Sequence, residues 1–308
     1  MILLSGIPSE SPMELVRSRL DASGQPYVFF HQRRFADMDM QFEVADGLVY
    51  GELRIGREVY PLEEFTAVYT RLMDDNNLPE VKNEPAGSPK RKWCRSLHDT
   101  LIRWLEIAPA RVVNRTGPMG SNFSKPYQAQ LIRQHGFRTP ETLVTSDPEM
   151  VRQFLAVHRK VIYKSISGTR SIVQTLNEED MARLDQIRWC PVQFQEFVEG
   201  RNVRVHTVGG DVFATAIRSD ATDYRYARKQ TGDAASLEAD TLPGELATRC
   251  LKLASALDLD FAGIDLKITP EGAVYCFEVN PSPAYSYYEM NTGQPISAAL
   301  ARYLAEPD

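Results

Sequence analysis

The sequence is poor in cysteine and has no long apolar run. Its four cysteines, Cys94, Cys190, Cys250 and Cys276, show no Cys-x-x-Cys spacing, so neither a zinc site nor a disulfide framework is indicated. We expect a cytoplasmic protein, since free cysteines are typical of reducing compartments. No apolar run approaches the roughly 20 residues of a membrane span. Residues 1–8 (MILLSGIP) lack the basic start and long apolar core of a signal peptide and predict a first strand.

A strong charge bias and the motifs of several enzyme classes are also missing. The formal net charge is −6, so nothing draws the whole chain toward nucleic acid or an anionic membrane. No GxxxxGK[ST] phosphate-binding loop occurs, and no Ser/His/Asp or Cys/His pattern points to nucleophilic catalysis. His206, inside an apolar run, is expected to be a packed side chain. What remains is an ordinary globular composition in 308 residues, enough for two or three lobes.

The first third of the chain alternates strand-like and helix-like patterns. Residues 2–30 show the strand, helix, strand order of a βαβ unit, which predicts a small parallel sheet. Residues 41–62 alternate over shorter runs and predict an antiparallel meander. A further strand at residues 67–72 contains Arg71, which is expected to be a solvated surface residue, with a substrate contact as the alternative.

Residues 261–283 carry the clearest chemical pattern. Two apolar runs flank a Pro-Glu-Gly turn signal and predict a β-hairpin. Asp265 lies in the first run, while Glu278 and Asn280 lie two apart in the second, so alternation points both to one face. Their oxygens suit Mg²⁺, which would also separate two carboxylates that otherwise repel. From the hairpin alone, solvent-facing acids on an ordinary hairpin remain an equal alternative.

Two lysines stand where an anion would explain them. Lys125 lies in the first turn of a helix predicted to end at Gly136, where the helix dipole disfavours a cation. A nearby anion would resolve that conflict, and a screened surface lysine is the alternative. Lys164 precedes residues 165–171 (SISGTRS), a small loop whose N–H groups and hydroxyls could wrap a triphosphate. An exposed strand lysine is the alternative for Lys164.

These patterns together resemble a known family. GID at residues 263–265, FEVNPSP at 277–283 and EMNTG at 289–293 are similar to the C-terminal signature of the ATP-grasp superfamily, specifically of RimK-type ligases. The resemblance covers about residues 114–300. It implies an α/β (α+β) protein with an ATP-grasp fold and an N-terminal pre-ATP-grasp α/β domain. The resemblance implies that Mg²⁺ is held between the ATP phosphates by Asp265, Glu278 and Asn280.

The resemblance also assigns residues to the nucleotide. Lys125 and Lys164 resemble the two phosphate-contacting lysines of the superfamily. Residues 165–171 correspond to its glycine-rich lid but hold only one glycine, so this lid is leaner than usual. Residues 191–200 (PVQFQEFVEG) resemble the hinge whose backbone pairs with adenine and whose acidic residue holds the ribose. The cofactor-binding candidates in the lid and hinge are Ser167, Gly168, Gln195, Glu196, Phe197, Val198 and Glu199.

Three arginines complete the implied site. A second predicted hairpin begins at Asn202, where the family commonly has Asp, and this departure leaves the role of Asn202 open. Arg204 and Arg218 lie in its apolar strands, where a buried guanidinium would need an anion such as phosphate or carboxylate. Arg204 is assigned to the nucleotide. Arg225 resembles the family arginine that faces the transferred phosphate or the acceptor, with a structural salt bridge as the alternative. Arg218 and Arg225 are the expected catalytic residues.

The predicted division of the chain has three parts. Residues 1–113 form the N-terminal domain, which we expect to select the substrate. The pattern breaks near residue 114, where Gly and Pro cluster. Residues 114–190 form a central lid subdomain, and residues 191–308 form a C-terminal subdomain with the Mg²⁺-binding hairpin.

The predicted activity is that of an ATP-dependent carboxylate–amine ligase. It would activate a carboxylate as an acylphosphate and join it to an amine or thiol. The expected cofactors are ATP and two Mg²⁺ ions, with Mn²⁺ as a substitute. The expected partners are small-molecule or peptide carboxylates and amines, with no nucleic acid or membrane, and a homo-oligomer stays open. The alternatives are a peptide macrocyclase that forms side-chain esters or amides, a small-molecule kinase, and a nucleotide sensor without turnover.

Overall fold

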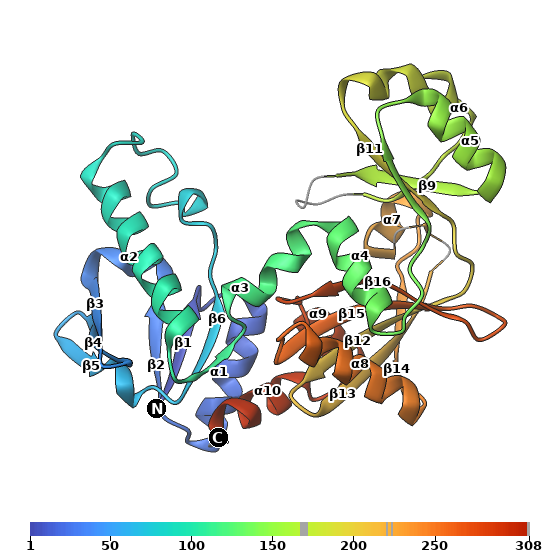
Figure 1. The fold of residues 1–308 in the computed structure, drawn as a ribbon. Coiled ribbons are helices and arrows are strands. Elements are labelled where there is room, and N and C mark those ends of the chain that lie inside the picture. The colour runs from blue at the N-terminus through green and yellow to red at the C-terminus, as the bar shows by residue number, and fades with distance from the viewer. Residues whose placement is uncertain (167–171, 220, 223, 307–308) are drawn as a thin grey trace.

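Four sheets organise the part of the chain that the computed structural model describes, which is residues 1–166, 172–219, 221–222 and 224–306. The side chains of residues 225, 227 and 229 also lie outside this description. Figure 1 shows the N-terminal elements (blue to cyan) beside the C-terminal sheet (orange), with a smaller green and yellow lobe above that sheet. Within the described ranges, no helix is both long enough and apolar enough to cross a membrane.

The N-terminal part is built on a parallel sheet with the order β2-β1-β6-β7, and an antiparallel meander β3-β4-β5 lies beside it. Both features were predicted from the sequence and are confirmed. The elements are β1 (Ile2–Gly6), α1 (Ser11–Ser23), β2 (Tyr27–His31), β3 (Met38–Ala45), β4 (Leu48–Ile55), β5 (Glu58–Pro61), β6 (Ala67–Arg71), α2 (Pro89–Ile107) and β7 (Arg111–Val113).

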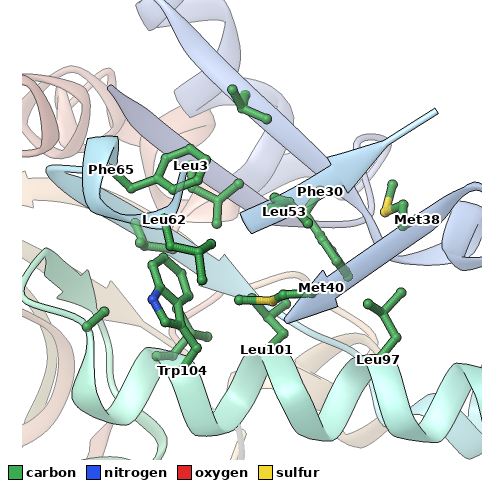
Figure 2. Packing of buried hydrophobic residues seen from close by; sticks show 14 of the residues in the cluster. Leu3, Phe30, Met38, Met40, Leu53, Leu62, Phe65, Leu97, Leu101 and Trp104 are labelled. Atoms are coloured by element: carbon green, nitrogen blue, oxygen red, sulfur yellow. The ribbon is translucent and has the colours of Figure 1, made fainter. Parts of the chain in front are cut away.

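Helix α2 packs across this part through one apolar face. Leu97, Leu101 and Trp104 recur at helical spacing and point toward the strands (Figure 2), because residues three and four apart share one side of a helix. Leu3 of β1 and Met40 of β3 belong to the same buried cluster, so the helix covers both sheets. Fully burying a side chain of this size stabilises the fold by roughly 1.5–3 kcal/mol.

A small antiparallel sheet with the order β10-β9-β11-β8 forms a separate lobe. Val151, Val161, Leu184 and Phe194 make up its core. The elements of this stretch are α3 (Thr116–Met119), α4 (Lys125–Gln134), β8 (Thr142–Thr145), α5 (Pro148–His158), β9 (Val161–Ser165), β10 (Gln174–Thr175), α6 (Glu178–Ala182) and β11 (Val192–Glu196). Strand β11 pairs with β8 and β9, so the lobe continues past the boundary expected between residues 190 and 191.

The C-terminal sheet has the order β14-β13-β12-β15-β16. Its elements are β12 (Arg201–Val208), β13 (Asp211–Arg218), α7 (Ala227–Gln230), β14 (Ser236–Asp240), α8 (Gly244–Ala256), β15 (Phe261–Ile268), β16 (Val274–Asn280), α9 (Ser286–Thr292) and α10 (Ile296–Ala305). Both predicted hairpins, β12–β13 and β15–β16, are confirmed. Helix α8 packs on one face of this sheet, and α4 packs on β16 at its edge, so α4 joins this sheet and not the small lobe.

One hydrophobic core joins the N-terminal part to the C-terminal sheet. Leu4 and Tyr69 of the parallel sheet belong to the same buried cluster as Phe261 of β15, Tyr285 and Leu300 of α10. Helices α1 and α10 pack against each other within it. These two parts therefore share one hydrophobic core, whereas the small lobe has a core of its own.

Candidate active site

The hairpin β15–β16 places Asp265 and Glu278 directly opposite each other. In the antiparallel register Asp265 pairs with Glu278, and Gly263 pairs with Asn280. Directly opposed residues point to the same side of a sheet, with Cβ atoms about 4.5–5.5 Å apart. A bulge follows Asp265, and bulges commonly re-aim a neighbouring side chain. The predicted common face for the two carboxylates and the amide is confirmed.

Lys125 places a positive charge against Glu278. It begins α4, and its Nζ forms an ion pair with Glu278 Oε1 and donates to Asn122 Oδ1 at 2.7 Å. Burial raises the pKa of Glu278, but the charge and hydrogen bond of Lys125, together with the charges of Arg204 and Lys164, bring the pKa below its ordinary value. Glu278 is therefore the nearby anion that offsets the unfavourable position of Lys125 in the first turn of a helix. The surface alternative for Lys125 is wrong.

Arg204 holds Asp265 from β12, the strand that pairs with β15 on the other side from β16. It is buried, and its Nη1 donates to Asp265 Oδ1 at 2.8 Å. Burial lowers the pKa of Arg204, but Asp265 reverses the effect, so the pKa lies above its ordinary value. Gly263 makes room for this arrangement, because a Cβ there would collide with the guanidinium. His206 is fully buried beside Arg204, as predicted for a packed histidine.

A cleft runs between the small lobe and the hairpin. It consists of adjoining cavities of about 130 Å³ and 420 Å³, and Lys164 lines both. Asp265 and Glu278 line the smaller cavity, and Lys125 lines the larger one. The two lysines and two carboxylates predicted to share a site thus meet at one cleft, although they come from four separate segments. The exposed-strand alternative for Lys164 does not describe this position.

The hinge supplies one wall of the cleft. Gln195, Phe197 and Val198 line the smaller cavity. Gln195 Nε2 donates to Thr142 Oγ1 at 2.9 Å, whereas Gln195 Oε1 is buried and has no hydrogen-bond partner among the described residues. Buried polar atoms are rarely left unpaired, so an N–H group of a ligand in the cleft would satisfy this oxygen.

Three expected site residues lie away from the cleft. Glu196 accepts a hydrogen bond from the Glu141 N–H at 3.1 Å, and Glu199 is exposed. Arg218 is 72% exposed and pairs with Glu238 at 3.1 Å, so the expectation that its apolar strand buries it is wrong. The buried stretch of β13 ends at Ile217, one residue before Arg218. The residues whose expected roles fall outside the described residues or side chains are Ser167, Gly168 and Arg225.

Lys267 is a cleft residue that sequence reasoning missed. Its Nζ donates to the Val198 carbonyl at 3.1 Å and lies 5.3 Å from the ring centre of Phe197. Burial, and then the charge of Lys160, lower its pKa below the ordinary value. The available signal was its position two residues after Asp265, since alternate residues of a strand share a face.

Two buried side-chain amides hold the hairpin through hydrogen bonds, and sequence reasoning missed them as well. Asn114 Nδ2 donates to the carbonyls of Phe261 and Pro281, both at 2.6 Å, and so ties the start of β15 to the end of β16. Gln128 of α4 pairs with both backbone groups of Val279, between two of the expected metal ligands. Asn and Gln are common everywhere, so their types alone gave no signal.

The side chain of Arg71 is mostly buried, so the expectation of a solvated surface residue is wrong. Its side chain is 9% exposed and forms an ion pair with Glu10 at 2.6 Å. It lines a second, larger cleft of about 830 Å³ at the carboxyl ends of β1 and β6. Ser282, which follows the hairpin, lines the same cleft, so this space reaches from the N-terminal sheet to the loop after β16.

The donor set of the hairpin fits a hard divalent cation. Among the described residues, His, Cys, Asp and Glu form no group of three that could hold a metal. The hairpin instead offers two carboxylates, Asp265 and Glu278, and the amide of Asn280. Oxygen donors of this number suit Mg²⁺, which keeps waters and takes further oxygens from phosphates. The ion pair between Lys125 and Glu278 shows that a positive charge is accommodated there.

Comparison with known proteins agrees with this geometry. The family model for the RimK-like ATP-grasp domain matches residues 124–304, which is more than half of the chain. The chain is 25% identical to N-acetylaspartylglutamate synthase A of Mus musculus, over 66% of this chain and 56% of that protein. It therefore spans little more than half of that relative's length. It is 27% identical to a probable alpha-L-glutamate ligase of Halorhodospira halophila, over 66% of this chain and 70% of that one.

Solved structures match over nearly the whole chain. A Chryseobacterium gregarium RiPP-associated ATP-grasp ligase, in complex with ADP and a leader and core peptide, has a TM-score of 0.81 at 24% identity, over 98% of this chain and 96% of that one. The ATP-grasp ligase PsnB complexed with a minimal precursor has a TM-score of 0.77 at 26% identity, over 98% of both chains. The fold, the paired carboxylates and the matched family model lead to one conclusion: the chain belongs to the RimK-like ATP-grasp family.

Proposed function

We propose that the protein is an ATP-dependent ligase that activates a carboxylate as an acylphosphate and joins it to an amine. The observation that carries this proposal is the facing of Asp265 and Glu278 with Lys125 and Lys164 across one cleft. Opposite charges held around an open space suit a ligand that brings both phosphate and metal. The cytoplasm is the compartment we propose, since the four cysteines are free.

The nucleotide base would lie against the hinge. Phe197 and Val198 offer an apolar surface and backbone groups there, and the unpaired Gln195 Oε1 would accept from an amino group of the base. The phosphates would lie toward Lys125 and Lys164. Glu196 is engaged elsewhere, and we propose Gln195 or the cleft residue Asn202 as polar contacts of the nucleotide.

The metal site would be made of Asp265, Glu278 and Asn280, and we propose two Mg²⁺ ions there. When bound, the metal neutralises phosphate oxygens during phosphoryl transfer. Arg204 orients Asp265, because its buried guanidinium donates to that carboxylate. When the nucleotide binds, the Lys125 ammonium group would leave Glu278 and contact phosphate oxygens instead.

The chemistry proceeds in two transfers. A substrate carboxylate oxygen attacks the γ-phosphorus of ATP and ADP leaves, which gives an acylphosphate. An amine then attacks the acyl carbon, loses a proton and expels phosphate. Lys125 and Lys164 stabilise the charge on the transferred oxygens. Arg218 and Arg225 stay proposed contacts of that phosphate or of the acceptor, and Arg218 would have to leave Glu238 to reach it.

Substrate selection would fall to residues 1–113. The 830 Å³ cleft lies at the carboxyl end of their parallel sheet and is large enough for a dipeptide or a longer segment. Relatives named as glutamate ligases make glutamate a first amine to test. A second candidate, a peptide macrocyclase, is favoured by the near-complete match to structures of ATP-grasp ligases with precursor peptides.

A hydroxylamine screen tests the proposal. Purified protein is incubated with ATP, Mg²⁺, hydroxylamine and a panel of amino acids and peptides, and hydroxamate and ADP are measured. We expect one class of acid to give both products in equal amounts. ADP with a stable phosphoester would indicate a kinase, and nucleotide binding without turnover across the panel would indicate a sensor. Either result would reject the ligase.

A further inference from the structure

Arg71 joins three segments that are distant in the sequence. It ends β6, and its Nε and Nη2 both donate to Glu10 Oε1, at 2.9 Å and 2.6 Å. Its Nη1 donates to Ser282 Oγ at 3.0 Å and to the Pro283 carbonyl at 3.1 Å. The guanidinium thus connects the loop before α1, the end of β6 and the loop after β16.

The loop that Arg71 holds also orients a proposed metal ligand. The Ser282 N–H donates to Asn280 Oδ1 at 2.9 Å. An amide oxygen has two lone pairs, so Oδ1 can accept from Ser282 and still offer one pair to a cation. The orientation of Asn280 therefore depends on the position of Ser282. Asn114 holds the neighbouring Pro281 carbonyl, but its side-chain hydrogen bonds within the described residues go to Phe261 and Pro281, not to Ser282 or Asn280.

The geometry at Arg71 requires a guanidinium. Four donor contacts leave in two directions, toward Glu10 on one side and toward Ser282 and Pro283 on the other. Lysine carries three donors on one atom and cannot span both sides from one position. A lysine at this position would keep a charge beside Glu10 but lose the hydrogen bonds to Ser282 and Pro283.

We propose that Arg71 is a positioning residue for the metal site, which holds Asn280 in place through Ser282. This inference rests on the proposed function, because Asn280 is a metal ligand only within it. Partners that orient a metal ligand without touching the metal typically change metal affinity by about 10–100-fold when they are lost. Arg71, Glu10 and Ser282 also line the 830 Å³ cleft. A substrate bound in that cleft would therefore contact the residues that orient Asn280.

The test compares Arg71→Gln, Arg71→Lys and Ser282→Ala with the control Arg33→Gln. Arg33 forms an exposed ion pair with Glu80 in the same N-terminal part, away from the metal ligands. Binding of the imido analogue of ATP is titrated calorimetrically at increasing Mg²⁺. We expect Arg71→Gln to raise the half-saturating Mg²⁺ at least tenfold, and Arg33→Gln to leave it unchanged. Arg71→Lys should melt near wild type and still show the raised Mg²⁺ requirement, which a purely structural role would not produce.

A second readout needs neither metal nor nucleotide. Pro281 and Pro283 have no N–H, so Ser282 supplies the single exchanging amide of residues 281–283. Hydrogen exchange at that amide should be at least tenfold faster in Arg71→Gln than in wild type. Exchange and Mg²⁺ requirement that both stay within twofold of wild type would overturn the inference.

Ser282→Ala protects the test against misfolding. It removes one contact of Arg71 and keeps the buried guanidinium with Glu10. If Arg71→Gln does not fold, a Mg²⁺ requirement raised at least threefold in Ser282→Ala supports the proposal, and an unchanged requirement overturns it. Wild-type protein that binds no nucleotide with Mg²⁺ would reject the proposed function itself, and this outcome is read from wild type alone.

Discussion

Replacing Glu278 by glutamine separates the role of its charge in the metal site from its role in the fold. Glutamine keeps the size of the side chain and removes the carboxylate that pairs with Lys125. The pair is partly exposed, 23% for Lys125 and 26% for Glu278, so the 3–5 kcal/mol typical of breaking a buried pair is an upper bound. Lys125 also keeps Asn122 as a partner. We therefore expect a loss of about 1 kcal/mol in the free energy of unfolding.

Binding should change far more than stability in Glu278→Gln. Replacing a charged carboxylate ligand by a neutral amide should weaken Mg²⁺-dependent nucleotide binding by about 100-fold or more, since changes at partners one step further out already cost about 10–100-fold. Calorimetric titration of an ATP analogue with Mg²⁺ and with EDTA measures this, and urea unfolding measures stability. The matched control is Asp211→Asn, which removes an exposed ion pair with Arg302 in the same sheet.

The pH dependence of stability gives the same variant a second check. The pKa of Glu278 is lowered in the folded state, so its stabilising contribution is present above the unfolded value of about 4.3 and is lost as the pH falls through the folded value. The stability difference between wild type and Glu278→Gln should vanish at the acidic end of that range. Normal Mg²⁺-dependent binding in the glutamine variant would refute the assignment of the site.

Four other variants test the neighbourhood of the cleft. Arg204→Gln leaves Asp265, which is 30% exposed, without its cation and should lower the unfolding free energy by about 1–3 kcal/mol in urea, and an unchanged free energy would contradict a stabilising pair. Asn114→Ala leaves backbone groups at the ends of the hairpin unpaired and should cost about 3 kcal/mol in the same assay. Lys164→Ala should abolish ADP formation with an unchanged circular dichroism spectrum, and near-normal turnover would count against the site. Burial and the charge of Arg204 keep the pKa of His206 well below its ordinary value, so stability should fall as the pH drops from about 7 to 5, by at most about 1.4 kcal/mol per pH unit, and His206→Gln should flatten this slope.

The hairpin and its ligands were accessible from the sequence because their geometry is local. A turn signal between two alternating runs fixes which side chains share a face, and the observed register places Asp265 opposite Glu278. The approach of Lys125 to Glu278 was different, because 153 residues separate them and no spacing rule predicts a contact at that range. For that contact, the resemblance to a family supplied what local pattern could not.

The errors came from burial that distant segments decide. Arg71 looks like any charged residue at a strand end, and it is buried only because Glu10 and the loop after β16 close over it. Arg218 shows the reverse case, since a side chain one position beyond a buried run already reaches solvent. The pattern of β11 reads as a strand in whichever sheet it joins, so sequence alone misplaced the lobe boundary.

The core shared by the N-terminal part and the C-terminal sheet bears on protein engineering within the family. A version trimmed of residues 1–113 would uncover Tyr285 and Leu300, which are buried against β6 and α1 in the intact chain, and should aggregate. Residues 142–196 enclose a core of their own. Chimeras that exchange this stretch between relatives should therefore stay folded where swaps of the first hundred residues fail.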